Sequence, residues 1–122
     1  MKTGENVKIL RIYTSSTDKL KHTPVYEMIV YAARRSRMAG ATVHKGVMGF
    51  GSSAVVHSAK FWETNDKLPV IVEIIDEASK IDDFYKMIKP YLESMRYGCL
   101  ATLEDAHVLL SKSGRKMSIF NP

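Results

Sequence analysis

Three glycines within six residues, Gly46, Gly49 and Gly51, form the most distinctive local pattern in the sequence. Glycine lets backbone amides approach a ligand closely or line a nest for an anion. The spacing differs from a dinucleotide-binding fingerprint, and no Gly-Lys-Ser/Thr follows as in a Walker loop. The segment, which also contains Phe50, therefore predicts either a backbone anion site or a bulge and turn that end a strand.

Basic residues that could hold a phosphate occur at two further places in the chain. Arg96 precedes Tyr97 and Gly98. The C-terminal segment adds Lys112, Arg115 and Lys116. Lys and Arg make charge-assisted hydrogen bonds to phosphate oxygens. Because no general base or metal-ligating set lies near them in the sequence, a site built from them would hold an anion without activating water.

The side chains most often used in catalysis and metal binding form no recognisable set. Histidines occur in different predicted elements, without the short spacing of metal ligands, at His22, His44, His57 and His107. The single cysteine, Cys99, excludes an internal disulfide, and we expect it to be a buried thiol. Glu104 and Asp105 would point to opposite faces of a strand. We expect no catalytic residue and no metal site.

The chain has 122 residues, of which 45% are hydrophobic and 25% charged, and we expect one domain over residues 1–122. Its net charge of +5 is uneven, because residues 1–60 hold ten Lys and Arg against three Asp and Glu. A basic half attracts anions, although a solvated surface is equally compatible with it. The absence of a long apolar stretch, of a secretory signal and of paired cysteines favours a cytoplasmic protein.

Hydrophobic periodicity predicts four strands, at residues 7–13, 41–47, 68–75 and 100–110, the last most clearly at 106–110. A helix follows the first strand, with Thr23 as its cap and Gly40 as its terminator. A second follows the third strand, capped by Asp76 or Ser79 and ended by Gly98. This β-α-β-β-α-β order is typical of the ferredoxin-like α+β sandwich, in which two helices lie on one face of a four-stranded antiparallel sheet.

Two helices leave the other face of such a sheet uncovered. The predicted strand at 68–75 is apolar on both faces, which requires cover on both. A second copy of the same chain is the simplest cover, so we expect a homo-oligomer. The predicted core spans residues 7–110, with a long loop or irregular hairpin at 50–67 and a basic tail at 111–122.

An ordered set of motifs across residues 7–110 resembles a family known as domain-of-unknown-function family 190. The matching motifs are Leu10-Arg11-Ile12-Tyr13, Pro24-x-Tyr26-Glu27, Ala39-Gly40-Ala41-Thr42-Val43, Gly46-x-x-Gly49-Phe50-Gly51, Leu68-Pro69-Val70-x-x-Glu73, Ile75-Asp76, Lys80-Ile81 and Thr102-Leu103-Glu104-Asp105. This family looks like a branch of the nitrogen regulatory protein PII superfamily. Its members are small cytoplasmic ferredoxin-like proteins, generally homotrimers, and PII proteins bind adenine nucleotides between subunits.

The resemblance implies a non-catalytic signalling protein that needs no cofactor and has an adenine nucleotide as its candidate ligand. It implies that the loop at 50–67 contacts a protein partner, and the association of family genes with a fluoride-export channel suggests a membrane transporter or channel. The ligand would be framed by Gly46, Gly49, Phe50, Gly51, Arg96, Tyr97 and Gly98, with Lys112, Arg115 and Lys116 completing a phosphate site. The Gly-rich, Lys-containing turn of PII proteins is absent after the second predicted helix, and residues 50–67 contain no tyrosine to modify.

Two other functions remain open from the sequence. A small enzyme or metal-handling protein could use the same fold, although no convincing catalytic or ligand set is present. An RNA-binding module could use the basic first half, but the aromatic motif on which ferredoxin-like RNA-binding domains stack bases is missing. Nucleic acid is therefore not an expected partner.

Overall fold

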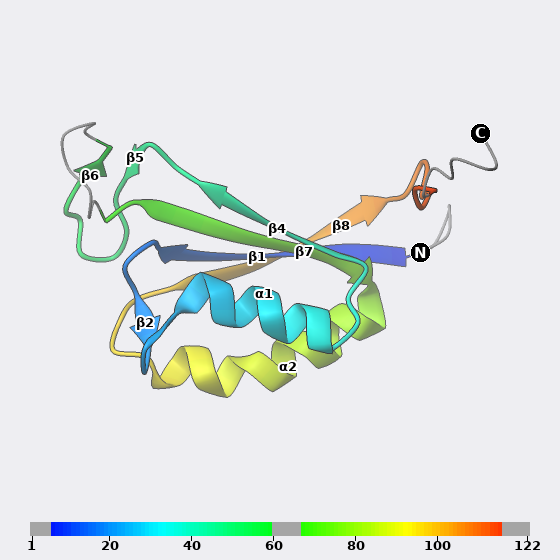
Figure 1. Cartoon of the computed structure of the whole chain (residues 1–122), viewed down its shortest axis with the longest axis horizontal. Coiled ribbons are helices and arrows are strands. Elements are labelled where there is room, and N and C mark those ends of the chain that lie inside the picture. Colours follow the sequence, from blue (N-terminus) through cyan, green and yellow to red (C-terminus); the bar gives the residue numbers. More distant parts are fainter. Residues whose placement is uncertain (1–5, 60–66, 116–122) are drawn as a thin grey trace, which may run out of the picture.

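A computed structural model describes residues 6–59 and 67–115. Figure 1 shows the elements along the chain. They are β1 (Asn6–Ser15), β2 (Lys19–Leu20), β3 (Thr23–Pro24), α1 (Val25–Arg35), β4 (Gly40–Lys45), β5 (Met48–Gly49), β6 (His57–Ser58), β7 (Pro69–Glu77), α2 (Ala78–Ser94) and β8 (Leu100–His107). In the described part of the chain no helix is both long enough and apolar enough to cross a membrane.

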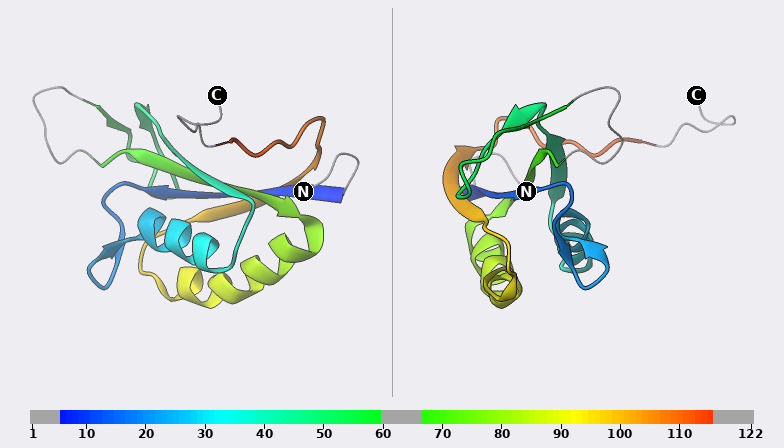
Figure 2. Two further views of the ribbon diagram at one scale, coloured as in Figure 1. Left: turned by 45° about the vertical axis from the view of Figure 1, so that its right-hand side comes forward. Right: turned by 90° about the vertical axis from the view of Figure 1, so that its left-hand side faces the viewer.

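The four long strands form one antiparallel sheet in the order β4-β7-β1-β8. Both helices pack on the same face of this sheet (Figures 1 and 2). The short strands β2 and β3 pair with each other, as do β5 and β6. This arrangement confirms the predicted ferredoxin-like α+β sandwich, with two helices on one face of a four-stranded antiparallel sheet.

The core lies between the sheet and the two helices. Alternate residues of β1 and β7 point into it, as the two-residue period of a strand requires, and Leu10 lies opposite Ile74 across the two strands. The helices supply apolar residues at helical spacing. The buried side chains include Leu10, Ile12, Val25, Ile29, Val70, Val72, Ile74, Ile81, Phe84 and Ile88.

The intervening residues of β1 and β7 lie on the face away from the helices, which we call the open face. The central strand β7 places Ile71 and Ile75 there, on either side of Glu73. The expectation that this strand is apolar on both faces is therefore confirmed. Since both helices lie on the other side of the sheet, they cover none of these side chains (Figure 2).

The boundaries of α1 differ from the prediction. Thr23 does not cap the helix, because it pairs with Leu20 in the β2–β3 hairpin, and no side chain caps the helix start. Helix α1 ends at Arg35, and Arg37 adopts the left-handed conformation with a φ of 59°. Gly40 is not the terminator, since it is the first residue of β4.

The boundaries of α2 and β8 also differ. Neither Asp76 nor Ser79 is the cap; Glu77 precedes the helix, and no side chain caps it. The helix ends at Ser94, before Gly98, because the backbone of Met95 is extended. Strand β8 ends at His107, so the prediction that residues 106–110 form its clearest part was wrong. The residues beyond it include Leu109 and Leu110, which are exposed.

Candidate functional site

Gly46 and Gly49 bring the β4–β5 connection against the start of β7. The backbone N–H of Gly46 donates to the carbonyl of Pro69 at 2.8 Å. A Cβ atom at Gly46 would lie 2.8 Å from the Cγ atom of Pro69, and one at Gly49 would lie 3.2 Å from it. A side chain at Gly46 would therefore clash with Pro69, and one at Gly49 would make a tight contact with it.

Gly98 lies against Ser52, the residue that follows Gly51 in the glycine segment. A Cβ atom at Gly98 would lie 2.6 Å from the Oγ atom of Ser52, whereas a Cβ atom at Gly51 would meet no atom within 4 Å. The turn after Gly51 closes with a hydrogen bond from the N–H of Ala54 to the carbonyl of Gly51. The structure thus brings the glycine segment and the α2–β8 connection together.

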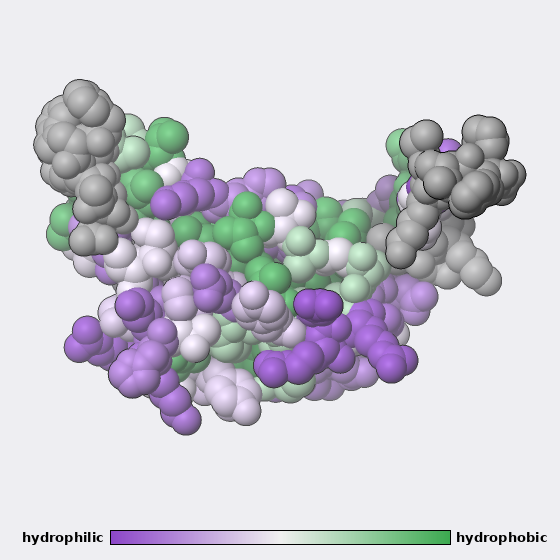
Figure 3. Space-filling view, in the orientation of Figure 1, coloured by the Kyte–Doolittle hydropathy of each residue, from purple (hydrophilic) through white to green (hydrophobic). Residues whose placement is uncertain are grey.

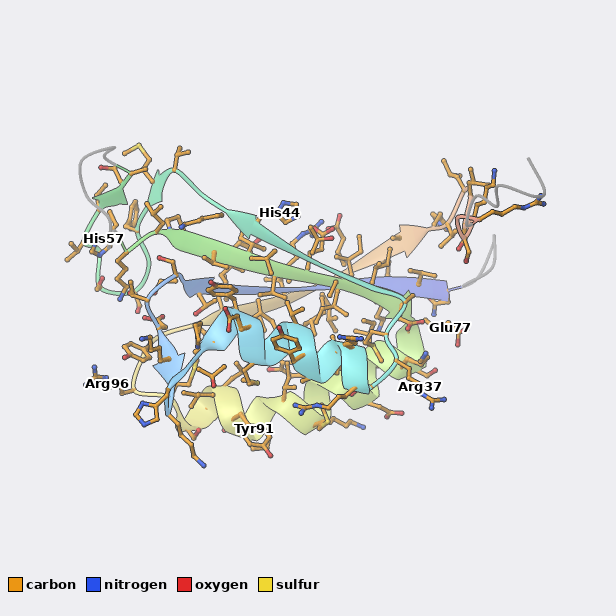
Figure 4. All side chains as sticks on the ribbon, viewed as in Figure 1. Arg37, His44, His57, Glu77, Tyr91 and Arg96 are labelled. Carbon is orange, nitrogen blue, oxygen red and sulfur yellow. The ribbon has the colours of Figure 1, made fainter. Side chains whose placement is uncertain are left out.

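Two cationic side chains lie beside the ring of Tyr97 in the α2–β8 connection. The guanidinium carbon of Arg96 is 5.0 Å from the ring centroid, and the same side chain donates to the Tyr97 hydroxyl at 3.2 Å. The ammonium of Lys67 is 5.7 Å from the centroid. Figure 4 shows Arg96 at the same end of the molecule as His57 of β6. Sequence reasoning identified Arg96 and Tyr97 but missed Lys67, which is distant in the sequence and carries no motif.

Asp18 is a buried carboxylate next to Lys67, and it was also missed. Only 3% of Asp18 is exposed. Its Oδ1 atom lies 3.5 Å from the ammonium of Lys67, and its Oδ2 atom accepts a long hydrogen bond of 3.4 Å from Thr14. Within residues 6–59 and 67–115, neither Oδ1 nor the buried Oγ atom of Ser15 has a hydrogen-bond partner. In the sequence, Asp18 resembles an ordinary solvated turn residue.

The described part of the basic tail, residues 111–115, lies at the other end of the sheet. Strand β8 begins with Leu100 opposite Tyr13 and ends with His107 opposite Asn6. Eight residues of strand span about 26 Å at roughly 3.3 Å per residue. A single chain therefore keeps Arg96 well apart from the tail residues, and Figure 1 shows the segment after β8 at the opposite end from β5 and β6. The predicted ligand residues Lys112 and Arg115 are exposed, and Lys116 lies outside the described residues.

A row of charged side chains crosses the open face. Arg11 donates to Glu73 at 3.0 Å from Nε and also donates to Glu104 from Nη1. His44 lies 3.9 Å from the same oxygen of Glu73. The hydrogen bonds to Glu104 and Glu73 raise the pKa of Arg11 above its ordinary value, so this group cannot serve as a proton donor or acceptor at neutral pH.

Two further expectations concern reactive and metal-binding groups. Cys99 is exposed, so the expectation of a buried thiol was wrong. Partial burial, followed by the charge of Asp18, raises the pKa of the Cys99 thiol, which disfavours the nucleophilic thiolate. Among the residues whose structure is described, no three His, Cys, Asp or Glu side chains are grouped so that they could hold a metal ion.

Sequence comparisons identify relatives over most of the chain. The model of the DUF190 family, described as "Uncharacterized ACR", matches residues 7–108. A UPF0166 protein of Aquifex aeolicus is 35% identical over 102 residues, which cover 84% of this chain and 92% of that protein. A UPF0166 protein of Methanocaldococcus jannaschii is 32% identical over 101 residues, covering 83% and 90% of the two chains.

Structural comparisons identify PII-like proteins. CPII, a nitrogen regulatory PII-like protein from Thiomonas intermedia solved with ADP, AMP and bicarbonate, superposes with a TM-score of 0.63 at 16% identity, covering 84% of this chain and 88% of that one. A candidate PII-like signalling protein from Thermus thermophilus gives a TM-score of 0.60 at 16% identity, covering 85% and 90%. At such low identity these matches show that the chain has a PII-like fold.

Proposed function

The chain belongs to the DUF190 family, and on this basis we propose that it is a non-catalytic PII-like signalling protein. Its ligand is an anionic small molecule, an adenine nucleotide, bound between the subunits of a homotrimer. Binding changes the affinity of the loop at 50–67 for a protein partner, for which a membrane transporter or channel is the candidate. Such regulation requires only that the nucleotide bind two loop states with different affinity.

One observation carries the shared site: the predicted ligand residues lie at both ends of the sheet. Arg96, Tyr97 and the glycine segment lie at one end, and Lys112 and Arg115 follow the far end of β8. A single chain therefore offers one part of the set at each end. Two copies placed end to end bring the two parts to one cleft. The adenine nucleotides in the crystals of CPII support the choice of ligand.

Exposed hydrophobic side chains at the two ends support the same assembly. At the β5–β6 end, Phe50 is 71% exposed, and Figure 3 shows hydrophobic surface there. Other exposed apolar residues at that end include Val47, Met48, Val55 and Val56. At the opposite end Leu109 is 88% exposed, next to the exposed Leu110. Two different apolar patches on one chain suit a head-to-tail contact, which closes into a ring when the rotation allows.

The loop between β4 and β7 suits contact with a protein partner through apolar rather than charged groups. Residues 46–59 contain no Asp, Glu, Lys or Arg, although a quarter of the chain is charged. Residues 60–66 of this loop lie outside the described part of the chain. The partner is therefore expected to offer an apolar surface to those side chains of residues 46–59 that the contact between subunits leaves exposed, and binding there should depend little on salt.

Calorimetric titration of the purified protein with ATP, ADP, AMP and cyclic AMP tests the ligand. We expect saturable binding of at least one of these nucleotides and no significant hydrolysis. Turnover of ATP at about 1 per second or faster, a typical enzyme rate, would favour the enzyme alternative. The absence of binding for all four would remove the nucleotide from the proposal.

Mixing two defective chains tests whether the site is shared. Arg96→Ala and Arg115→Ala each remove a charge-assisted contact, and each should weaken nucleotide binding about tenfold or more. If the site combines the two ends of neighbouring chains, oligomers assembled from both variants contain some clefts with Arg96 and Arg115 both intact. In calorimetric titration of the mixed oligomers, a fraction of the sites should then bind the nucleotide as tightly as the wild type does. No recovery after verified mixing would place both residues in the same chain's site, or one of them outside any site.

A further inference from the structure

We propose that Lys67 and Arg96 form an anion-binding pair beside Tyr97, and that the buried Asp18 sets the affinity of the pair by competing with the anion for Lys67. This inference deepens the proposed function and takes from it only the identity of the anion, the phosphate chain of a nucleotide. The pair itself rests on the geometry around Tyr97. Lys67 would be a direct ligand contact, and Asp18 a positioning residue that acts through it.

Arg96 offers a positive charge that no acidic side chain of the described residues neutralises. Arg96 is exposed, and its guanidinium donates a hydrogen bond to the Tyr97 hydroxyl. The ring holds the guanidinium at 5.0 Å from its centroid, where cation–π attraction limits the freedom of the side chain. The guanidinium keeps further N–H donors for a phosphate or carboxylate.

Lys67 precedes a residue whose backbone is anchored by two hydrogen bonds, and its head group is accessible. The neighbouring residue Leu68 donates its N–H to the Oγ atom of Ser16 at 3.0 Å and accepts a hydrogen bond from the N–H of Ser16 at 2.9 Å. The Lys67 side chain is 42% exposed. Because each cation lies near the same ring, at 5.7 and 5.0 Å, the two are at most about 11 Å apart. A chain of phosphate groups carries several acceptor oxygens and can reach both.

Asp18 is the reason why Lys67 does not bind anions at full strength. The carboxylate is buried, its Oδ1 atom has no hydrogen-bond partner among the described residues, and Lys67 is the cation that faces it. A buried carboxylate that loses its ion-pair partner is strongly destabilised. An anion that takes over Lys67 leaves Asp18 in that state and also places a second negative charge close to it. Both effects lower the affinity of the anion.

Three variants separate this mechanism from a structural role for Asp18. Asp18→Asn keeps the shape of the side chain and removes its charge, which frees Lys67 for the anion. Lys67→Met keeps most of the stem and removes the ammonium. In the double variant the effect of Asp18→Asn should disappear, because Asp18 acts through Lys67. If Asp18 only supported the fold, its replacement would weaken binding whether Lys67 were present or not.

The experiment is calorimetric titration of the full chain and these variants with inorganic pyrophosphate, ADP and uncharged adenosine at one salt concentration. We expect Asp18→Asn to tighten pyrophosphate and ADP binding about tenfold and Lys67→Met to weaken both about tenfold, the size of one charge-assisted contact. Adenosine binding should not change. Lys86→Met removes a lysine from an exposed position on α2 and is the matched control, with no expected effect.

The outcomes separate this inference from the proposed function. If ADP binds the wild type and all variants equally, the nucleotide function stands and the pair is wrong. If pyrophosphate follows the expected pattern but ADP binds no better than pyrophosphate, the pair stands and the nucleotide is wrong. The inference is overturned if Asp18→Asn weakens anion binding, if its effect persists without Lys67, or if no chain binds an anion. Should Asp18→Asn fail to fold, Lys67→Met and Arg96→Met must each still weaken pyrophosphate binding.

Discussion

Asp76 is a buried carboxylate that joins three parts of the fold. It accepts hydrogen bonds from the N–H of Glu77 at 2.7 Å and from the N–H of Ala39 at 2.8 Å, and Lys80 lies 3.2 Å away. Burial alone raises the pKa of this carboxyl, but the two backbone hydrogen bonds and Lys80 outweigh burial, and the net pKa is lowered. One side chain therefore fixes the end of β7, the start of α2 and the connection into β4.

The lowered pKa of Asp76 predicts acid sensitivity. Because its pKa is lower in the folded than in the unfolded chain, its contribution to stability is complete above the unfolded pKa of about 3.9 and is lost as the pH falls through the folded value. Asp76→Asn should lower the free energy of unfolding at pH 7 by about 1–3 kcal/mol. Urea denaturation between pH 7 and pH 3 should show a smaller loss of stability for the variant than for the wild type. Parallel curves would contradict this.

Gly51 differs from its neighbouring glycines in having free space around it. Gly51→Val should leave the thermal midpoint of unfolding unchanged, since a Cβ atom there meets nothing within 4 Å. It should abolish nucleotide binding if the backbone at Gly51 approaches a phosphate. Gly46→Val is the contrasting variant and should destabilise the fold, because its Cβ atom would lie 2.8 Å from Pro69. Unchanged nucleotide affinity in Gly51→Val would assign that glycine to the turn alone.

At the scale of the elements, the end of α1 contains a residue in an unfavourable conformation. Arg37 has a φ of 59°, while its N–H donates to the carbonyl of Arg34 and the N–H of Met38 donates to the carbonyl of Ala33. This arrangement usually has glycine in the left-handed position. The hydrogen bond from Lys80 to the Arg37 carbonyl involves the backbone, so a side-chain change leaves it intact.

Arg37→Gly should therefore stabilise the protein by about 0.5–1 kcal/mol, because removal of the Cβ strain exceeds the added entropy of the unfolded chain. Urea denaturation at pH 7 measures the change. Ser36→Gly is the control, since Ser36 has an ordinary φ of −79° and glycine there brings only the entropic loss. A variant at position 37 that is less stable than the wild type would show that the left-handed backbone is not strained.

Elements with strong periodicity could be predicted from the sequence, and their ends could not. The nearly continuous run of Val70, Val72 and Ile74 with Ile71 and Ile75 predicts a strand that is apolar on both faces, which the structure has. The cap assigned to Thr23 failed because a two-residue pairing with Leu20 competes for the same backbone. Such short hairpins have too few residues to produce a period.

The candidate site could be predicted only in part, for a related reason. Gly51 and Gly98 were linked through a family resemblance, and the contact between Ser52 and Gly98 agrees with that link. Lys67 and Asp18 were missed, because they are 49 positions apart in the printed sequence and become neighbours only when β1 pairs with β7. Ion pairs of this kind follow from strand register and leave no local pattern.

At the scale of the whole molecule, the open face predicts self-association. Sedimentation should show an oligomer at micromolar concentration, with a trimer as the expected species. Arg11→Met should weaken assembly, because it leaves Glu73 and Glu104 on the same face without the cation that both contact. The variant monomer should remain folded, because the row is accessible to solvent in a single chain.

Lys8→Met is the matched control for Arg11→Met. Lys8 lies on the same strand but pairs with Asp82 of α2, on the helix side of the sheet, at 3.7 Å. Sedimentation of this variant should equal that of the wild type. If both variants sediment as the wild type does, the open face is not the contact surface between chains.

The separation of Arg96 and the tail along β8 also has a consequence for inheritance. In a ring with head-to-tail contacts, every chain supplies one end to each of its two clefts. A gene product defective at both ends would then spoil two of three clefts in a trimer that also contains two normal chains. A cell that carries one normal and one such allele should therefore show a dominant defect, stronger than the halved dose of normal protein would cause.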